Sequence, residues 1–498
     1  MSFPYLSAIL FLPVVGAIVI ALLSKPEQKT IRTVALVFSL LSFALSLYVF
    51  AGFDRSTAAI GLMQFEEKLD WFPAVGAAYH LGVDGISLPM LVLTTIIGVL
   101  VVLVSWKVTL RAREYFVWLL VLETSVLGVF ASVDLILFFI FWEIELVPMY
   151  FLISIWGTGR KEYSAIKYVI YTVLGSAMML TGILTLYFTV GTMDMSVIAR
   201  TDLSELRAVI PLTGMFVLLL IGFAIKLPVF PLHTWLPDAH TDAPTAVSVV
   251  LAGVLLKMGG YGMIRFNVGF FPDVARSLAP ILAALAVVNV LYGAAVTLRQ
   301  TDLKRLIAYS SVSHMGLVLL GIFALTSVSL TGATLQMFSH GIVTGLLFAM
   351  VGLVYDKTHN RNLTTLGGLA RRMPVIAVVF SLAGLASLGL PGTSGFAAEF
   401  LVFVGSFTSS AFDSARVMTL LSAFGIVLTA GYILWLLQRV FYGPPLEQYA
   451  HVPDADRVEM VCIFSFCALI MLIGLYPAIL TNIIQMGTKP IVALLGMP

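Results

Sequence analysis

IGFAIKLPVFP at residues 221–231 and VLAGVLLKMGG at residues 250–260 each place one lysine inside an apolar stretch long enough to cross a membrane. Neither Lys226 nor Lys257 has a charged neighbour within one helical turn. A charged side chain at the centre of a bilayer costs about 2.5–3.5 kcal/mol on insertion scales. Such a residue normally faces a wet cavity or a partner charge. The two lysines therefore indicate a membrane pathway for protons or other cations.

The composition excludes a soluble globular protein. Of 498 residues, 60% are hydrophobic and 11% are charged, and the mean hydropathy is +1.03. Because a membrane-spanning helix needs roughly 20 apolar residues, we predict about fourteen spans and an all-α polytopic membrane fold. The first span lacks a basic leader and a small-residue cleavage site, so we expect a retained helix. The predicted spans are centred near residues 13, 43, 94, 121, 145, 179, 222, 254, 287, 314, 341, 390, 428 and 471.

Two of the predicted spans are interrupted by proline and glycine, at KLPVFP (226–231) and GLPGTSG (389–395). Proline removes a helical hydrogen bond, and a pair of broken spans is typical of transporters built from repeats. The breaks lie five spans apart, and this odd offset reverses the direction of the second unit. We therefore predict two inverted five-helix repeats. The predicted division is residues 1–110, a first repeat at 111–268, a second at 275–442, and a C-terminal helix at 443–498.

A carboxylate near Lys226 would make a switchable relay, because it would hold the lysine charged until the two groups separate. Glu143 and Glu145 are candidates, but two residues along a helix turn the side chain by about 200°. We expect Glu143 to pair with Lys226 and Glu145 to pack near Pro148 or reach another chain. The alternative for Glu143 is a buried structural ion pair.

Further ionisable residues lie near the centres of later spans. His314 and His340 suit proton transfer if their sites are wet, because the ordinary pKa of histidine is near 6.5; the alternative is packed, hydrogen-bonded histidines. Glu399 follows the second break and is interpreted as a relay member or, alternatively, as a helix cap. Accessory candidates are Glu123, Lys304, and the side chains His233, Asp238, His240 and Asp242 of HTWLPDAHTDAPT. That loop matches no zinc pattern, so we favour hydrated proton uptake or ordinary turn chemistry.

The chain is not expected to carry a metal or a redox cofactor. Cys462 and Cys467 are its only cysteines, too few for an iron–sulfur cluster. No dinucleotide-binding glycine pattern or phosphate-binding loop follows a predicted strand. Scattered basic residues give no sign of a nucleic-acid partner. Any redox chemistry must belong to another chain.

Loop charges predict the orientation. One set of alternate loops, which includes Arg160, Arg361 and Arg371, carries most of the loop arginines and lysines, whereas the opposite set includes Arg276 and Lys489. Basic loops stay on the cytoplasmic side. Both termini should therefore lie on the non-cytoplasmic side.

FFIFWEIELVPMYFLISIWG (138–157), the segment at 226–262 and LRQTDLKRLIAYSSVSHMG (298–316) resemble the antiporter-like membrane subunits of type I NADH dehydrogenase, respiratory complex I. The resemblance spans nearly the whole chain. It implies fourteen helices, two inverted repeats and a proton half-channel in each. The implied proton relay is Glu143, Lys226, Lys257, His314, His340 and Glu399.

The glutamate at position 399 favours one branch of the family, since chains resembling L and N usually carry lysine there and chain M, or chain 4, carries glutamate. The resemblance implies partners of the L, N, K, J, A and H types, which would hold the quinone, the NADH or ferredoxin site, the FMN and the iron–sulfur clusters. The location would be a bacterial inner membrane or a thylakoid. The alternatives are a subunit of a multisubunit sodium/proton antiporter or of a membrane-bound hydrogenase, or a purely structural membrane scaffold.

Overall fold

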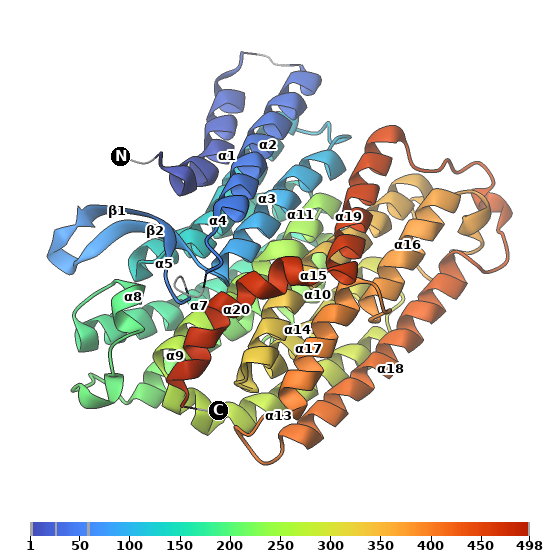
Figure 1. Ribbon diagram of the computed structural model, residues 1–498. Helices are drawn as coiled ribbons and strands as arrows, with labels where there is room; N and C mark the ends of the chain where they lie inside the picture. Colours follow the sequence, from blue (N-terminus) through green and yellow to red (C-terminus); the bar gives the residue numbers. More distant parts are fainter. Residues whose placement is uncertain (1–2, 25–26, 57–59, 497–498) are drawn as a thin grey trace.

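The computed structural model describes residues 3–24, 27–56 and 60–496, and most of them form helices (Figure 1). Twelve segments in this part of the chain are long and apolar enough to cross a membrane. They confirm the all-α polytopic class, while the number fourteen stays a prediction. The spanning segments are α1 (Tyr5–Leu22), α2 (Gln28–Gly52), α3 (Ser87–Val104), α4 (Ala112–Ala131), α5 with α6 (Leu135–Ile144, Leu146–Trp156), α7 (Lys161–Val190), α11 to η5 (Thr245–Val268), α13 (Pro272–Thr297), α14 (Leu303–Phe323), α15 (Ser327–Thr358), α18 (Ala415–Val440) and α19 (Arg457–Leu475).

Both predicted breaks are confirmed. Helix α9 (Leu212–Lys226) ends at the lysine itself, and α10 (Trp235–Asp242) resumes after the prolines. Helix α16 (Pro374–Ser387) is likewise separated from α17 (Ser394–Phe407). In the second break Gly389 and Gly392 have φ of +80° and +90°, a left-handed conformation that glycine adopts without steric cost. The boundaries of the two repeats remain a prediction.

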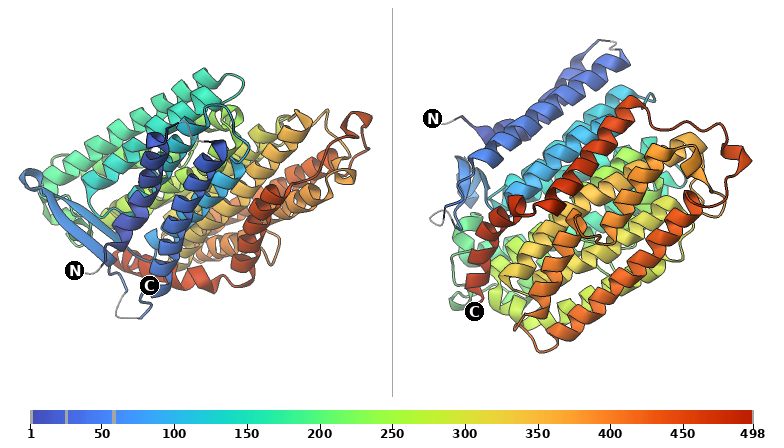
Figure 2. Two further views of the ribbon diagram at one scale, coloured as in Figure 1. Left: turned by 90° about the horizontal axis from the view of Figure 1, so that it is seen from above. Right: turned by 45° about the vertical axis from the view of Figure 1, so that its right-hand side comes forward.

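The centre of the bundle is made by three spans that carry three of the six predicted relay residues, Lys257, His314 and His340. The most apolar windows of α11 to η5, α14 and α15 are 100%, 94% and 94% buried, against 28% for α2 and 33% for α19. Figure 2 shows the less buried α2 and α19 at the periphery. Charged side chains on the central spans are therefore shielded from lipid by the other helices.

A β-hairpin and a last helix were not predicted. Strands β1 (Gln64–Phe72) and β2 (Ala77–Val83) pair antiparallel, with Lys68 opposite His80. Glu67 of the hairpin accepts hydrogen bonds at the start of α1, 2.7 Å from the amide of Leu6. Helix α20 (Ala478–Leu494) lies at the same end of the bundle, which we call the hairpin end (Figure 1). Strand β1 was missed because it is polar and mostly exposed, and the search for spans looked for long apolar runs.

The remaining short elements connect these spans. They are η2 (Pro73–Val75), α8 (Met195–Ile198), η3 (Leu203–Glu205), η6 (Leu369–Arg371) and η7 (Glu447–Tyr449). Within the eighth predicted span, α11 (Thr245–Val250) and α12 (Leu256–Gly262) alternate with the π-helical segments η4 (Leu251–Leu255) and η5 (Met263–Val268).

Candidate functional site

Lys226, at the end of α9, is bound by a carboxylate and a tyrosine. Its ammonium donates to Glu145 and, at 3.0 Å, to the hydroxyl of Tyr168. The same hydroxyl lies 2.8 and 2.6 Å from the two carboxylate oxygens of Glu145. The ring of Trp142, with its centroid 5.5 Å from the ammonium, covers the lysine further. Both charges are fully shielded, since Lys226 is 1% exposed and Glu145 is 0% exposed.

The predicted partner of Lys226 was therefore wrong. Glu143 is only half-buried, and its Oε1 has no hydrogen-bond partner among the described residues. The two glutamates do face different ways, as expected, but the inward one is Glu145. It lies at the junction where α5 ends at Ile144 and α6 begins, just before Pro148, which cannot donate a helical hydrogen bond.

Lys257 is held inside the eighth predicted span between two π-helical segments. Its ammonium donates to the backbone carbonyl of Ala252 and lies 2.8 Å from Nδ1 of His340 on α15. An ammonium cannot accept a hydrogen bond, so Nδ1 of His340 is the acceptor whenever Lys257 is charged. This contact allows one proton to pass directly between the two side chains. π-Helical turns are frequent at functional sites.

The helices that carry the two lysines touch at a glycine. A Cβ added at Gly259 would meet the backbone carbonyl of Phe223 and the amide of Leu227. Only glycine therefore permits this approach of α12 to α9, one residue beyond Lys226. The packing places Lys226 and Lys257 on directly adjoining backbones.

His314 on α14 connects His340 to Glu399. The two imidazole rings lie 5.6 Å apart between centroids, and Nε2 of His314 is 3.8 Å from a carboxylate oxygen of Glu399. The two ring nitrogens of His314 also lie 2.8 Å from the carbonyl of Ser310 and 2.9 Å from that of Ser387. A neutral imidazole can donate to only one carbonyl, whereas the imidazolium can donate to both. The charged form of His314 can therefore donate to both carbonyls at once.

Two small cavities flank Glu399, which is 5% exposed. Each has a volume of about 10 Å³, close to the minimum for one water molecule. Both are lined by His314 and Glu399; Ser422 lines one of them, and Gln336 and His340 line the other. A bound water in either cavity can bridge His314 to the carboxylate, and one in the second cavity can also reach His340.

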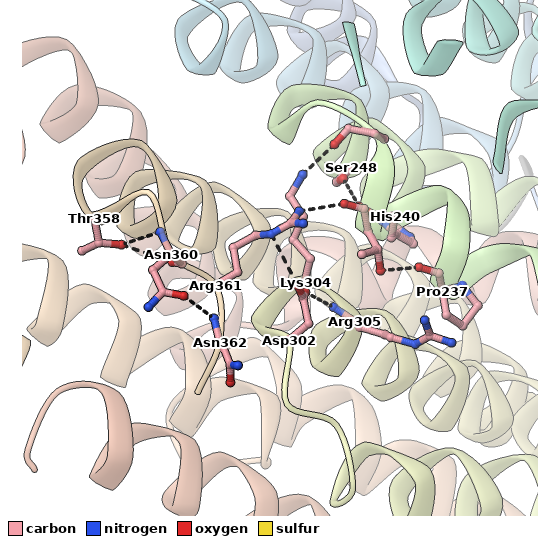
Figure 3. A network of polar contacts seen from close by, with 12 residues as sticks. Pro237, His240, Ser248, Asp302, Lys304, Arg305, Thr358, Asn360, Arg361 and Asn362 are labelled. Atoms are coloured by element: carbon pink, nitrogen blue, oxygen red, sulfur yellow. Dashed lines mark hydrogen bonds and ion pairs between the residues drawn. The ribbon is translucent and has the colours of Figure 1, made fainter. Parts of the chain in front are cut away.

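Two of the accessory residues, Lys304 and His240, belong to a polar network around the end of α10 (Figure 3). Lys304, 3% exposed, donates to the carbonyl of Ala243 at 2.6 Å. Arg361 donates to the carbonyl of Thr241 at 2.8 Å and pairs with Asp302 at 3.3 Å. These contacts fix the end of α10 against the loops that precede α14 and follow α15.

His240 and Asp242 occupy the inner side of this network. His240 is 0% exposed and stacks on Phe348 at 4.4 Å between centroids, while its carbonyl accepts from Ser248 at 3.0 Å. Neither ring nitrogen of His240 has a hydrogen-bond partner within the described part of the chain. Asp242 accepts from Ser164 at 2.6 Å. His240 therefore lies between the polar network and the relay helix α15 with its ring nitrogens free.

Asp238 and His233 lie on the other side of α10. Asp238 pairs with Lys167 at 2.7 Å and with Arg305 at 3.7 Å. His233, 1% exposed, packs against the ring of Tyr292 at 5.1 Å. Over the described residues, no group of three or more His, Cys, Asp and Glu side chains is arranged to hold a metal ion.

Glu123 lies outside this arrangement. On α4 it is 6% exposed and accepts a hydrogen bond from Ser39 of α2 at 2.9 Å. It also fills the space beside Gly98 of α3, where a Cβ would meet the carboxylate. Helices α2 and α3, and not the lysines, therefore surround it.

Tyr168 and Gln336 are relay-contacting residues that sequence reasoning missed. Tyr168 contacts both members of the ion pair, and Gln336 lines a cavity beside Glu399. Both are uncharged, and nothing in the local sequence separates them from other polar residues of membrane spans. Only their contacts in the folded structure identify them.

The sequence model of the NADH:quinone oxidoreductase/Mrp antiporter membrane subunits matches residues 132–429. The chain belongs to this family. A NAD(P)H-quinone oxidoreductase chain 4 from Trichormus variabilis is 43% identical over 99% of this chain and 92% of its own length. The predicted resemblance to antiporter-like subunits, and to their chain 4 branch, is confirmed.

Solved structures share the fold. A chain of respiratory complex I from Thermus thermophilus aligns with a TM-score of 0.87 at 27% identity, covering 99% of this chain and 100% of that one. A chain of the Mrp complex from a Dietzia species aligns with a TM-score of 0.83 at 23% identity, covering 99% of this chain and 55% of that one. The second similarity shows the shared fold alone.

Proposed function

We propose that this chain is a proton-translocating membrane-arm subunit of an NAD(P)H:quinone oxidoreductase, and that protons cross it through its buried ionisable residues. The observation that carries the proposal is the sequence of contacts along the bundle centre. The ion pair of Lys226 and Glu145 adjoins Lys257, which contacts His340, followed by His314 and Glu399. The similarity to chain 4 relatives favours this assignment over the sodium/proton antiporter, hydrogenase and scaffold alternatives.

The first half of the relay works as a charge switch. A buried ion pair is stable only while both partners are present, because each charge alone is costly to keep out of water. When redox chemistry in a partner subunit draws Glu145 away, Lys226 loses the charge that favours its protonated form. Its proton then moves toward Lys257 on the adjoining helix.

The second half passes the proton by short steps. Lys257 gives a proton to Nδ1 of His340, and the proton continues to His314, whose two carbonyl neighbours favour the imidazolium. From there it reaches Glu399 directly or through a water in the flanking cavities. Each step ends on a buried side chain that can bind the proton, so the proton does not pass into bulk water.

The ends of the pathway follow from the loop charges. The hairpin end is the non-cytoplasmic side, where both termini lie, and the polar network of Lys304 and His240 takes up protons from the cytoplasm. The chain itself binds no quinone, NADH, ferredoxin, FMN or iron–sulfur cluster; those groups reside in partner subunits, and the remaining partners are membrane-arm subunits of the same assembly.

The test is Lys257→Leu in the complete complex, reconstituted in proteoliposomes. We expect the proton-to-electron ratio to fall, while quinone reduction with an uncoupler present continues. The matched control is His359→Asn, at an exposed position with φ of 52° that asparagine tolerates. An unchanged ratio in the Lys257 variant would remove the relay assignment.

A further inference from the structure

A cavity of about 770 Å³ opens at the hairpin end, outside the relay. It lies between the hairpin, the segment around α8, the end of η5, and α20, and we call it the vestibule. Figures 1 and 2 show the hairpin and α20 together at this end of the bundle. Its charged and titratable lining residues are Glu66, Lys68, His80, Asp84, Asp194, Arg200, Tyr261 and Arg265.

His80 lines the vestibule, and its Nε2 has neither a hydrogen bond nor an ion-pair contact among the described residues. The residue is 4% exposed, and within the described ranges neither ring nitrogen has a hydrogen-bond partner. Nδ1 lies 3.4 Å from Asp194, whose same oxygen receives Lys68 at 2.7 Å. Leaving a buried polar group without a partner costs about 1–3 kcal/mol. Water in the vestibule removes that cost, since the cavity is large enough to hold several molecules.

One wall of the vestibule belongs to the span that carries Lys257. Arg265 pairs with Asp84 and donates to the hydroxyl of Tyr261 at 3.2 Å. Lys257, Tyr261 and Arg265 follow one another at four-residue spacing, and so share one face of the same span. At 1.5 Å per residue, the backbone of Arg265 lies about 12 Å along the span from that of Lys257. A fixed guanidinium charge beside a proton path repels protons.

We propose that the vestibule is a second proton-release site. A proton from Lys257 passes when the Arg265–Asp84 pair opens, is taken up by the imidazole of His80, and is then released to water on the outer side. Arg265 and Asp84 form the gate, and Tyr261 positions the guanidinium. This inference rests on the proposed function, because Lys257 must carry the proton. It adds a route that bypasses Glu399.

The first experiment is His80→Asn in the reconstituted complex, with His359→Asn as control. We expect a lower proton-to-electron ratio than in wild type, because asparagine fills the position of the imidazole but cannot take up and release a proton. In a separate variant, His80→Cys should react with a small impermeant thiol reagent from the hairpin end. A wild-type ratio in His80→Asn, or an unreactive cysteine in an assembled complex, would overturn the release site.

The second experiment tests the gate. Removing Arg265 alone would leave the Asp84 charge buried, so the double variant Arg265→Gln/Asp84→Asn is used to keep polar contact without charge. Vesicles holding it should leak protons faster than wild type under an imposed potential and without electron donor. Unchanged leak would overturn the gate. If His80→Asn pumps like wild type while Lys257→Leu loses pumping, the vestibule is rejected and the relay stands. If both variants pump normally, the proposed function itself is rejected.

Discussion

Lys226 is bound to Glu145 and not to Glu143, although Glu143 is only two residues away. The difference arises at the junction of α5 and α6, where Glu145 reaches Lys226 of α9 and Glu143 does not. This relationship decides which substitutions should abolish the switch.

Glu145→Gln and Lys226→Ala should both strongly reduce proton pumping, because each removes one charge of the buried pair. The double variant should be no worse than the more severe single variant, since residues that act as one unit are not additive. The measurement is the proton-to-electron ratio in proteoliposomes, with assembly checked on native gels. Glu143→Gln is the matched comparison, and a greater loss in it than in Glu145→Gln would contradict the observed pairing.

Tyr168→Phe should lower pumping partially. The substitution keeps the ring over Lys226 but removes the hydroxyl that contacts both charges. Hydrogen bonds to charged groups contribute about 1.5–3 kcal/mol, so the ion pair should be weakened and not lost. Tyr171→Phe on the same helix, whose hydroxyl contacts Thr234 at 2.7 Å, is the control. Equal effects of the two substitutions would show that Tyr168 has no special role.

Glu399→Gln should impair pumping severely, because an amide occupies the same space but cannot take up and release a proton. Glu399→Asp should retain partial function, since the titrating group survives on a shorter stem. Proton-to-electron ratios of the two variants check both statements. Normal pumping by the glutamine variant would mean that Glu399 is structural and that protons leave elsewhere.

Cysteines replacing Arg160 and Arg361 should react with an impermeant thiol reagent only from the cytoplasmic side, and a cysteine replacing Arg276 only from the other side. The reason is the excess of basic residues in the loops of the first two. Labelling of sealed vesicles of known orientation checks the expectation, and the buried native Cys462 and Cys467 should give little background. The reversed pattern would overturn the direction of transport.

The thermal stability of the hairpin end should fall in acid. Burial raises the pKa of Asp194, but its contacts with His80 and Lys68 dominate and hold that pKa well below its usual range. A carboxylate with a depressed pKa contributes stability that is present above its unfolded pKa, near 3.9, and lost as the pH falls through the folded pKa. Asp194→Asn keeps a residue able to cap α8 but loses the charge, so its melting temperature should differ from wild type at pH 6 and converge with it in strong acid. A difference that is constant with pH would contradict this assignment.

Much of the architecture was predictable from local sequence. Long apolar runs must form helices in a bilayer, because no water is present to satisfy the backbone. Proline and glycine predicted both helix breaks, at Lys226 and before Glu399. Proline lacks a backbone N–H and glycine adopts non-helical angles readily, so each disturbs a helix at its own position. Lysines, histidines and glutamates stood out because charges are rare in apolar spans.

The partners of those residues depended on packing between distant segments. Glu145 contacts Lys226 across 81 positions, and Lys257 meets His340 across 83. Which of two nearby glutamates turns inward depends on how the helix is rotated about its axis at the junction before Pro148. A shift of one or two residues in that rotation would bring the other glutamate to Lys226. A search for apolar spans and for charges within them does not detect Tyr168 or Gln336, which are uncharged. It also does not detect the hairpin with His80, which lies outside the spans. The partner of each buried charge therefore depends on which way its helix faces and on which distant helices pack against it. Both are set by the whole fold and not by the local sequence.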